Sequence, residues 1–324
     1  MKNMKTAAGM LCLAGILSLG MGTTVFAEDG DSHYPVTITT YNYENEPVEM
    51  TFEKAPEKVF AYANSNIEEL LALGLGDKIV AAYGLDGDVR EDLKDEFDKI
   101  QYMDTKPSKE EVVAMEPDFI AAWYSSFSDD WLSDVSFWQE RDVNTYMSLN
   151  SSAKGPASEF PRTIEDEYED ILNLGKIFDC EDKAEEIVDQ MKGEIDKVKE
   201  HVEGTDPLSV AVLEDEGDSF RVYGTETLGG NIPETLGAEL KLGAENSENV
   251  GAEDLIAADP DVLFMINYDG FMTADEAIAD ITDNPAYASL SAVKNNKVFS
   301  VNLNEVYCSG VRTYDGIMTF AKAL

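Results

Sequence analysis

One segment of this chain occurs twice, and the repeat limits what the chain can fold into. The first copy, SKEEVVAMEPDFI, spans residues 108–120, and the second, GAEDLIAADPDVL, spans residues 251–263, an offset of 251 − 108 = 143 positions. Both copies carry a capping position, adjacent apolar residues, a proline through which a helix cannot continue, and then an apolar run. Each half of the chain is therefore predicted to contain a short helix that leads into a buried strand.

The side chains of this repeated helix divide into two kinds. The apolar pairs Val112–Val113 and Leu255–Ile256 are expected to face the core. Glu110 and Glu253 fall in the first helical turn, where the helix dipole tolerates a carboxylate, and are expected to be exposed. Any surface helix favours acids there, and for a single copy this would be the preferred explanation, but the duplication makes a paired docking role competitive with it.

Short runs rich in β-branched and aromatic residues alternate with helical stretches on both sides of a proline-free middle segment, 163–202. This alternation predicts parallel sheets covered by helices. Apolar residues at helical spacing make the later part of the middle segment a long helix. The predicted strands are Val59–Ala63, Ile79–Tyr83, Phe119–Tyr124, Asn144–Ser148, Ser209–Leu213, Phe220–Tyr223, Val262–Tyr268 and Val298–Val301.

We therefore predict an α/β fold with two Rossmann-like lobes, built on parallel sheets, joined by a long connecting helix, with a ligand cleft between the lobes. The last helix is expected to begin near Tyr314 and to be cut short at Leu324. The predicted divisions are a signal peptide at 1–27, a leader with a short β-segment at 28–57, an N-terminal α/β lobe at 58–180, a connecting helix at 181–204 and a C-terminal α/β lobe at 205–324.

The N-terminus has the pattern of an export signal. Lys2 and Lys5 precede an apolar stretch at residues 10–21, and small residues lead to Ala27 before two acids. This order is typical of a cleavable secretory signal, and the apolar stretch is too short to span a bilayer. Cys12 lies inside that stretch and not at the end of a lipobox. Secretion without a lipid anchor is therefore expected.

An excess of acidic residues limits the classes of molecule that the chain can bind. The sequence has 24 basic residues against 65 acidic ones, a formal net charge of −41. Such a field repels nucleic acid and anionic lipid headgroups, so no nucleic-acid partner is expected. For the same reason, a pocket for an anionic ligand would need local cations of its own.

Cysteine and histidine are scarce, and their scarcity argues against a bound metal ion. Cys180 and Cys308 have no metal-like spacing; they could pair in an oxidising compartment, but two free thiols are expected. The two histidines are His33, in the predicted leader, and His201, at the end of the long helix. Receptors for bare zinc or manganese usually need several imidazoles. No metal site and no cofactor are therefore predicted, whereas a metal that arrives already chelated needs no protein ligand.

Several landmarks in order give the chain a family resemblance. They are KAPEKV at residues 54–59, NIEELLALGLG at 66–76 followed by DKIV, the Glu…Pro-Asp segment in both halves, and NNKVFS at 295–300. With these landmarks, the chain resembles the substrate-binding proteins of iron–siderophore and cobalamin ABC importers, the class with a rigid helix between its lobes. The resemblance covers about Val36 to Leu324.

The resemblance implies a mode of action. Glu110 and Glu253 would each form a salt bridge with arginines of the ABC permease in the membrane, one acid per lobe. The ligand would lie between the lobes, and Asp182–Val202 would be the connecting helix that permits only modest hinge closure. The implied ligand is a metal chelate, either a ferric siderophore or a corrinoid.

Ligands of open parallel sheets bind beyond the carboxyl ends of the strands. The segments at those positions here are rich in aromatic and small polar residues, as a site for a large amphipathic ligand should be. Arginine forks suit carboxylate and catecholate oxygens, and Arg90 is disfavoured because acids surround it. Any of these aromatics could instead belong to the core, and any arginine to a surface ion pair. The predicted ligand-binding residues are Asn64, Tyr83, Trp123, Tyr124, Arg221, Tyr223, Tyr268, Tyr307 and Arg312.

The predicted function is thus that of an extracytoplasmic binding protein that captures a metal chelate, in the first place a ferric siderophore, and delivers it to a permease. Cobalamin or haem binding by the same fold is an alternative. A secreted hydrolase with paired carboxylates is a further one, although no nucleophile elbow, phosphate loop or imidazole pair is present.

Overall fold

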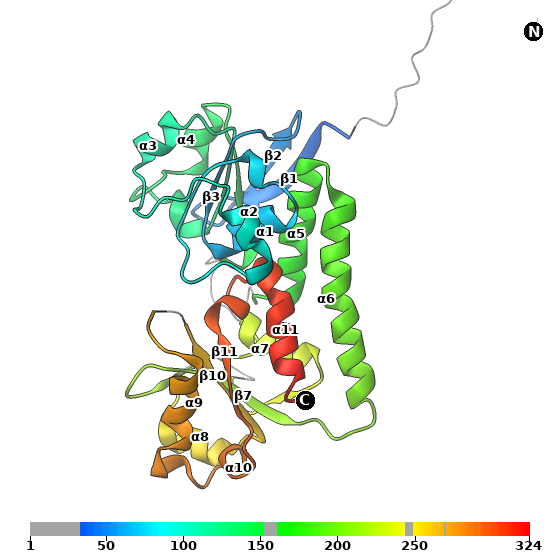
Figure 1. Ribbon diagram of the computed structural model, residues 1–324, viewed down its shortest axis with the longest axis vertical. Helices are drawn as coiled ribbons and strands as arrows, with labels where there is room; N and C mark the ends of the chain where they lie inside the picture. Colours follow the sequence, from blue (N-terminus) through cyan, green and yellow to red (C-terminus); the bar gives the residue numbers. More distant parts are fainter. Residues whose placement is uncertain (1–32, 152–160, 244–248, 269) are drawn as a thin grey trace, which may run out of the picture. The chain divides into compact units, whose positions relative to one another are not determined.

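Four parallel strands form the sheet of the N-terminal lobe, in the order β4-β3-β5-β6 (Figure 1). They are β3 (Val59–Tyr62), β4 (Ile79–Tyr83), β5 (Phe119–Ala122) and β6 (Asn144–Met147). Helices α1 (Asn64–Ala72), α2 (Lys94–Phe97), α3 (Lys109–Ala114) and α4 (Val135–Gln139) connect them. The predicted strands of this lobe start at these residues and run at most two residues too far. The largest overrun is at β5, where Trp123 and Tyr124 resemble strand residues in composition.

This computed structural model describes residues 33–151, 161–243, 249–268 and 270–324. The predicted signal peptide, including Cys12, lies outside the described residues. His33–Leu324 forms one compact unit. Within the described part of the chain, no helix combines the length and apolar character that a bilayer crossing requires.

An antiparallel hairpin precedes the first lobe strand. Strands β1 (Val36–Tyr41) and β2 (Pro47–Phe52) pair in register from Val36 opposite Phe52. Ile38 and Phe52 are buried in the same core as the N-lobe sheet, and the backbone N–H of Met147 in β6 donates to the Thr40 hydroxyl at 3.0 Å. The described part of the predicted leader therefore packs as an integral part of the N-terminal lobe.

Two long helices follow the N-lobe sheet. At the start of α5 (Ile164–Phe178), Thr163 and Asp166 form a capping box. The helix α6 (Glu181–Val202) buries one stripe, including Ala184, Val188, Met191 and Ile195, as its helical periodicity predicted. It contacts both α5 and the last helix, α11 (Thr313–Ala321) (Figure 1).

The sheet of the C-terminal lobe has the order β11-β10-β7-β8, with the short β9 paired to β7. Its elements are β7 (Ser209–Asp215), β8 (Phe220–Val222), α7 (Leu228–Thr235), β9 (Glu239–Leu240), α8 (Ala252–Ala258), β10 (Val262–Asn267), α9 (Ala274–Thr282), α10 (Ser291–Lys294) and β11 (Val298–Asn302). The sheet is mixed and not wholly parallel as expected, because β8 returns from β7 through a tight turn and pairs antiparallel to it.

Short 3-10 helices are the remaining helical elements of the described residues. They are η1 (Gly76–Lys78), η2 (Glu91–Leu93), η3 (Tyr124–Phe127), η4 (Leu149–Ser151), η5 (Pro285–Tyr287), η6 (Leu303–Glu305) and η7 (Gly310–Arg312). The last of these, η7, contacts α1 and α5 of the N-terminal lobe and leads into α11. It therefore ties the end of the chain to the first lobe.

Candidate functional site

The repeated helices are α3 and α8, and both present their first-turn acid to solvent. Glu110 and Glu253 are exposed at matching positions. Ser108 and Glu111 form the predicted capping box, with the Ser108 N–H donating to the Glu111 carboxylate at 2.8 Å. In the second copy, glycine has no side chain to accept, so only the reverse bond forms, from the Gly251 N–H to Asp254 at 2.9 Å.

One expectation for these helices is wrong. Val112 and Leu255 are fully buried, but Val113 and Ile256 are 37% and 38% exposed. A helix this short has room for only one core-facing residue per turn, so the neighbour at the next position turns outward. In both lobes the exposed acid is thus followed, three residues later, by an exposed β-branched residue on the same helical face.

Aromatic side chains gather at the carboxyl end of the N-lobe sheet. The Tyr62 ring, from the end of β3, stacks near Tyr83 from the end of β4 at 6.0 Å between centroids. It also meets the edge of Trp131 at 4.7 Å and that of Trp123 at 6.1 Å. We call these four residues the aromatic cluster. Gly84 makes room for it, because a Cβ there would lie 2.4 Å from the Tyr62 ring.

The aromatic cluster meets the C-terminal lobe through Trp123. Its ring lies 6.0 Å from that of Tyr307, which follows β11. The Trp123 indole N–H donates to the Ser65 hydroxyl at 3.0 Å, and Ser65 in turn lies 3.7 Å from the Cys308 sulfur. Trp123 is therefore held in place by both lobes.

In the C-terminal lobe, the predicted residues converge on Glu214, at the end of β7. The Tyr223 hydroxyl donates to Glu214 Oε2 at 2.9 Å, and Arg221 Nη1 lies 3.5 Å from the same oxygen. Burial, followed by the charge of Glu214, raises the pKa of Tyr268. Tyr307 also lies close enough to Tyr223 to affect the pKa of that phenol, which burial raises most.

Two other predicted residues stand slightly apart. The Asn64 Oδ1 accepts the Asp86 N–H at 2.6 Å, which leaves the buried Nδ2 without a protein partner. The Tyr124 ring stacks on Tyr43 of the β1–β2 turn, with 5.8 Å between centroids and 8° between planes. Tyr124 is therefore engaged with the hairpin.

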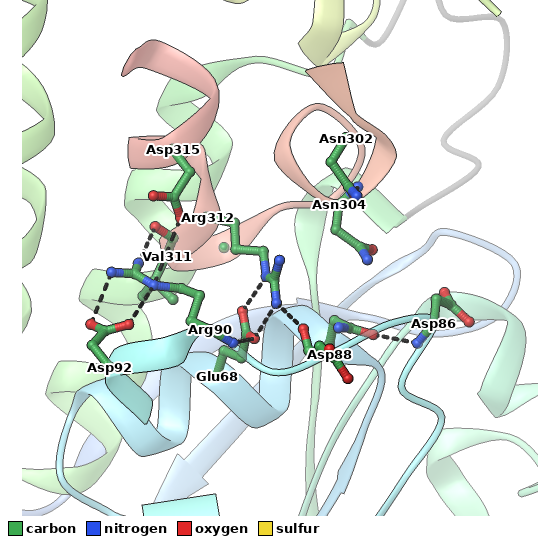
Figure 2. Close-up of polar contacts among 12 residues, drawn as sticks. Glu68, Asp86, Asp88, Arg90, Asp92, Asn302, Asn304, Val311, Arg312 and Asp315 are labelled. Atoms are coloured by element: carbon green, nitrogen blue, oxygen red, sulfur yellow. Dashed lines mark hydrogen bonds and ion pairs between the residues drawn. The ribbon is translucent and has the colours of Figure 1, made fainter. Parts of the chain in front are cut away.

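The structure places Arg312 in an ion pair across the lobes (Figure 2). Its Nε and Nη2 donate to the two carboxylate oxygens of Glu68, each at 2.7 Å, and Nη2 also donates to the Asp88 carbonyl. Glu68 is fully buried, whereas the Arg312 side chain is 12% exposed. Most of the guanidinium that was predicted to meet the ligand is thus occupied by protein, and a ligand role for Arg312 stays a prediction.

Arg90 is paired next to this ion pair. It contacts Asp92 at 3.0 Å and Asp315 at 3.7 Å, and donates to the Val311 carbonyl at 3.0 Å. Figure 2 shows its guanidinium turned toward these partners, with Asn302 and Asn304 on the C-lobe side of the same junction. This is the surface ion pairing that the acidic neighbours of Arg90 indicated.

Three further carboxyl groups are buried at the lobe junction. Oxygens of Glu69, Glu167 and Asp170 all lie within 4.8 Å of one another. Burial raises the pKa of Glu167 to about 7, and burial together with the neighbouring acids raises the pKa of Glu69 and Asp170 well above the ordinary range. Glu167 also accepts the N–H groups of Ser309 and Gly310 from the C-terminal side. Protons shared among these carboxyls lower the cost of burying them together.

His33, Cys180 and Cys308 bear on the predictions about metal ions and thiols. His33 packs on α5, with its Nε2 2.7 Å from the Lys176 carbonyl, and its other nitrogen faces Asp179 and Glu181. Cys180 and Cys308 are free thiols, as predicted.

Sequence reasoning missed Tyr62, Trp131, Asp86, Glu214 and Glu68. Asp86 lies just after β4 and Glu214 lies at the end of β7, where the rule of strand ends points. In a chain with 65 acidic residues, an acid at such a position carries little signal of its own. Tyr62 is the last residue of β3, two positions before Asn64, so the same rule could have found it. Glu68 gave no signal, because nothing in a helical stretch shows that a distant arginine will bury it.

The family of the chain follows from its match to known proteins. Residues 59–302 match the family model described as periplasmic binding protein. The chain belongs to this family: it is an extracytoplasmic substrate-binding protein of an ABC transporter, and it is not an enzyme.

Individual relatives match over most of the chain. The chain is 24% identical over 333 residues to YvrC of Bacillus subtilis (strain 168), an uncharacterized ABC transporter substrate-binding lipoprotein, with 99% of this chain and 98% of the relative covered. It is 24% identical to the petrobactin-binding protein YclQ of the same organism, over 79% and 78% of the two chains. The crystal structure of a periplasmic binding protein from Veillonella parvula DSM 2008 has a TM-score of 0.83 and 32% identity, covering 90% and 91%.

Proposed function

We propose that this protein captures a ferric siderophore or a similar metal chelate between its lobes and delivers it to an ABC permease. The observation that supports this most is the aromatic cluster of Tyr62, Tyr83, Trp123 and Trp131 at the strand ends of one lobe, joined to Tyr307 of the other. Large flat ring faces suit a bulky, partly apolar ligand. That a relative is named as a petrobactin-binding protein also favours an iron chelate.

Cobalamin or haem capture by the same site is the second candidate. It is supported by the same aromatic faces, which do not by themselves distinguish a macrocycle from a siderophore. Titration of tryptophan fluorescence tests both, because Trp123 and Trp131 belong to the cluster. Saturable quenching by a ferric siderophore at submicromolar concentration is expected. Saturation by cobalamin or haem alone would favour the second candidate, and no saturation by any of the three would reject the ligand site.

Delivery to the permease is proposed to use Glu110 and Glu253. Each is exposed in the first turn of the repeated helix, and Val113 and Ile256 present an apolar side chain beside each acid. An arginine on the permease would pair with each carboxylate, while the apolar neighbour would exclude water from the contact. These features support docking of both lobes to a two-subunit membrane partner.

Uptake of radiolabelled ferric chelate tests the docking. The double variant Glu110→Ala/Glu253→Ala is expected to bind the chelate normally but to lose most uptake. Asp275→Ala/Glu165→Ala is the matched control, because both residues are exposed first-turn acids of other helices, one in each half of the chain. Equal uptake by the two double variants would reject the docking role.

Retention at the cell surface is a separate proposal. We infer that a cleavable signal peptide ends near Ala27, although the predicted absence of a lipid anchor finds no support in the relatives, since YvrC is named a lipoprotein. Mass spectrometry of the mature N-terminus separates the two cases. A lipid-modified N-terminal cysteine would overturn the predicted absence of an anchor.

A further inference from the structure

Arginine is the residue that an anionic chelate would need at this site, and the described arginines are already engaged. Arg312 is paired with Glu68, and Arg90 with Asp92 and Asp315. Arg221 faces Glu214 at 3.5 Å, as described above. The other two, away from the predicted ligand residues, donate to backbone carbonyls: Arg162 to Asn150 at 3.0 Å and Arg141 to Phe137 at 2.7 Å.

Carboxylates, by contrast, stand beside the aromatic rings in both lobes. In the N-terminal lobe, Asp86 follows β4, and its backbone N–H donates to Asn64 Oδ1 at 2.6 Å, two residues beyond Tyr62 of the aromatic cluster. After burial, the charge of Asp86 is the next cause that raises the pKa of Tyr62. In the C-terminal lobe, Glu214 lies among Tyr223 and Tyr268, with its side chain 15% exposed. A ligand between the lobes would therefore meet an acid from each side.

One lysine lies against the aromatic cluster. Lys106 Nζ is 4.2 Å from the centre of the Trp131 ring, in a cation–π contact. This lysine is exposed, so its charge is largely screened by solvent. Arg221, whose side chain is 44% exposed, compensates part of the Glu214 charge. Lys106 and Arg221 together still do not offset Asp86, Glu214 and the field of a chain whose net charge is −41.

We infer that the chelate bound by this protein carries no net negative charge, and that it presents cationic or N–H and O–H donor groups to Asp86 and Glu214 while its apolar surface packs on the aromatic cluster. This inference rests on the proposed function and names the ligand class for that same site. A neutral or cationic ferric trihydroxamate has this chemistry. Aromatic faces also favour cations directly, through the negative charge of their π-systems.

Physical reasoning gives the size of the preference. Two unit charges several ångströms apart at a partly exposed site interact by a few kcal/mol before salt screening reduces the effect. Replacing a net charge of −3 by +1 on ligands of similar size is therefore expected to tighten binding by at least about tenfold at low salt.

The test is a fluorescence titration with three iron complexes: a trihydroxamate of net charge +1, a neutral trihydroxamate and a tricatecholate of charge −3. The expected order of affinity is cationic, then neutral, then anionic. Raising the NaCl concentration should weaken binding of the cationic complex, because salt screens an attraction. Preferred binding of the tricatecholate would overturn the inference but leave the receptor function standing, whereas failure of all three would remove the proposed iron-chelate function itself.

Variants locate the source of the preference. Glu214→Gln keeps an oxygen that can accept from Tyr223, so the local fold has the means to persist, and Asp86→Asn removes the other charge. Each is expected to weaken the cationic complex several-fold and to change the neutral one less. Glu140→Gln is the control, because it removes one charge from an exposed position with 79% side-chain exposure. Equal effects of Glu140→Gln and Glu214→Gln would show that only the overall charge matters and would refute a role for these two acids.

Discussion

Breaking the Arg312–Glu68 ion pair is expected to cost much stability. Removing one member of a buried pair leaves the other charge uncompensated, at about 3–5 kcal/mol. Glu68 is fully buried and would lose two hydrogen bonds of 2.7 Å. It would keep the Arg90 N–H at 2.8 Å, so Arg312→Met is expected at the lower end, about 3 kcal/mol. Glu68→Gln should cost about 2 kcal/mol, because an amide still accepts from Arg312.

Urea unfolding of the two single variants and of the double variant measures the loss of stability when the Arg312–Glu68 pair is broken. The double variant is expected to cost about 2 kcal/mol less than the sum of the singles, because each single already removes one of the two charges on which the attraction depends. Lys99→Met is the control, since the Lys99–Glu96 pair is exposed, with side chains 64% and 53% accessible, and should change stability by less than about 0.5 kcal/mol. Strict additivity, or an Arg312→Met cost no larger than that of the control, would refute a buried pair between the lobes.

Three other expectations follow from the described residues. Gly84→Ala is expected to cost about 1–3 kcal/mol in urea unfolding, because a Cβ there meets the Tyr62 ring at 2.4 Å and φ is +89°; an unchanged midpoint would contradict the packing. Burial raises the pKa of Glu167 to about 7 from an ordinary 4.5, so the folded chain holds this proton more tightly than the unfolded chain does. As pH rises from 4.5 to 7, the free energy of unfolding should therefore fall by about 3 kcal/mol. Glu167→Gln, which does not titrate, should make this pH dependence smaller. Burial raises the pKa of Cys180 to about 11 and that of Cys308 well above its usual value, so a thiol reagent at pH 8 should label both slowly in the native protein and rapidly in denaturant; fast native labelling of Cys308 would be inconsistent with its burial.

Local sequence patterns predicted much of the fold because the signals act over short distances. The capping position at Ser108 is occupied as predicted, since its partner Glu111 lies three residues away. Strands such as Ile79–Tyr83 were predicted to the residue because their apolar runs are bounded by turn residues. The antiparallel β8 was not predicted, because strand direction depends on the turn from β7 and not on composition.

The site was predicted only in part, and the reason is long-range pairing. The rule of strand ends placed Tyr83, Trp123 and Tyr307 near one another, and the first two share the aromatic cluster. The same rule could not say which partner each arginine would find. The pairing of Arg312 with Glu68 joins residues 244 positions apart, and only the three-dimensional arrangement of η7 on α1 brings them together.

A crystal structure with a bound ferric trihydroxamate tests the central claim most directly, because anomalous scattering locates iron without reference to the fold. The iron is expected between the lobes, with the chelate against Trp123 and Tyr307 and its donor groups toward Asp86 and Glu214. Iron found elsewhere on the surface, with these rings untouched, would contradict the account.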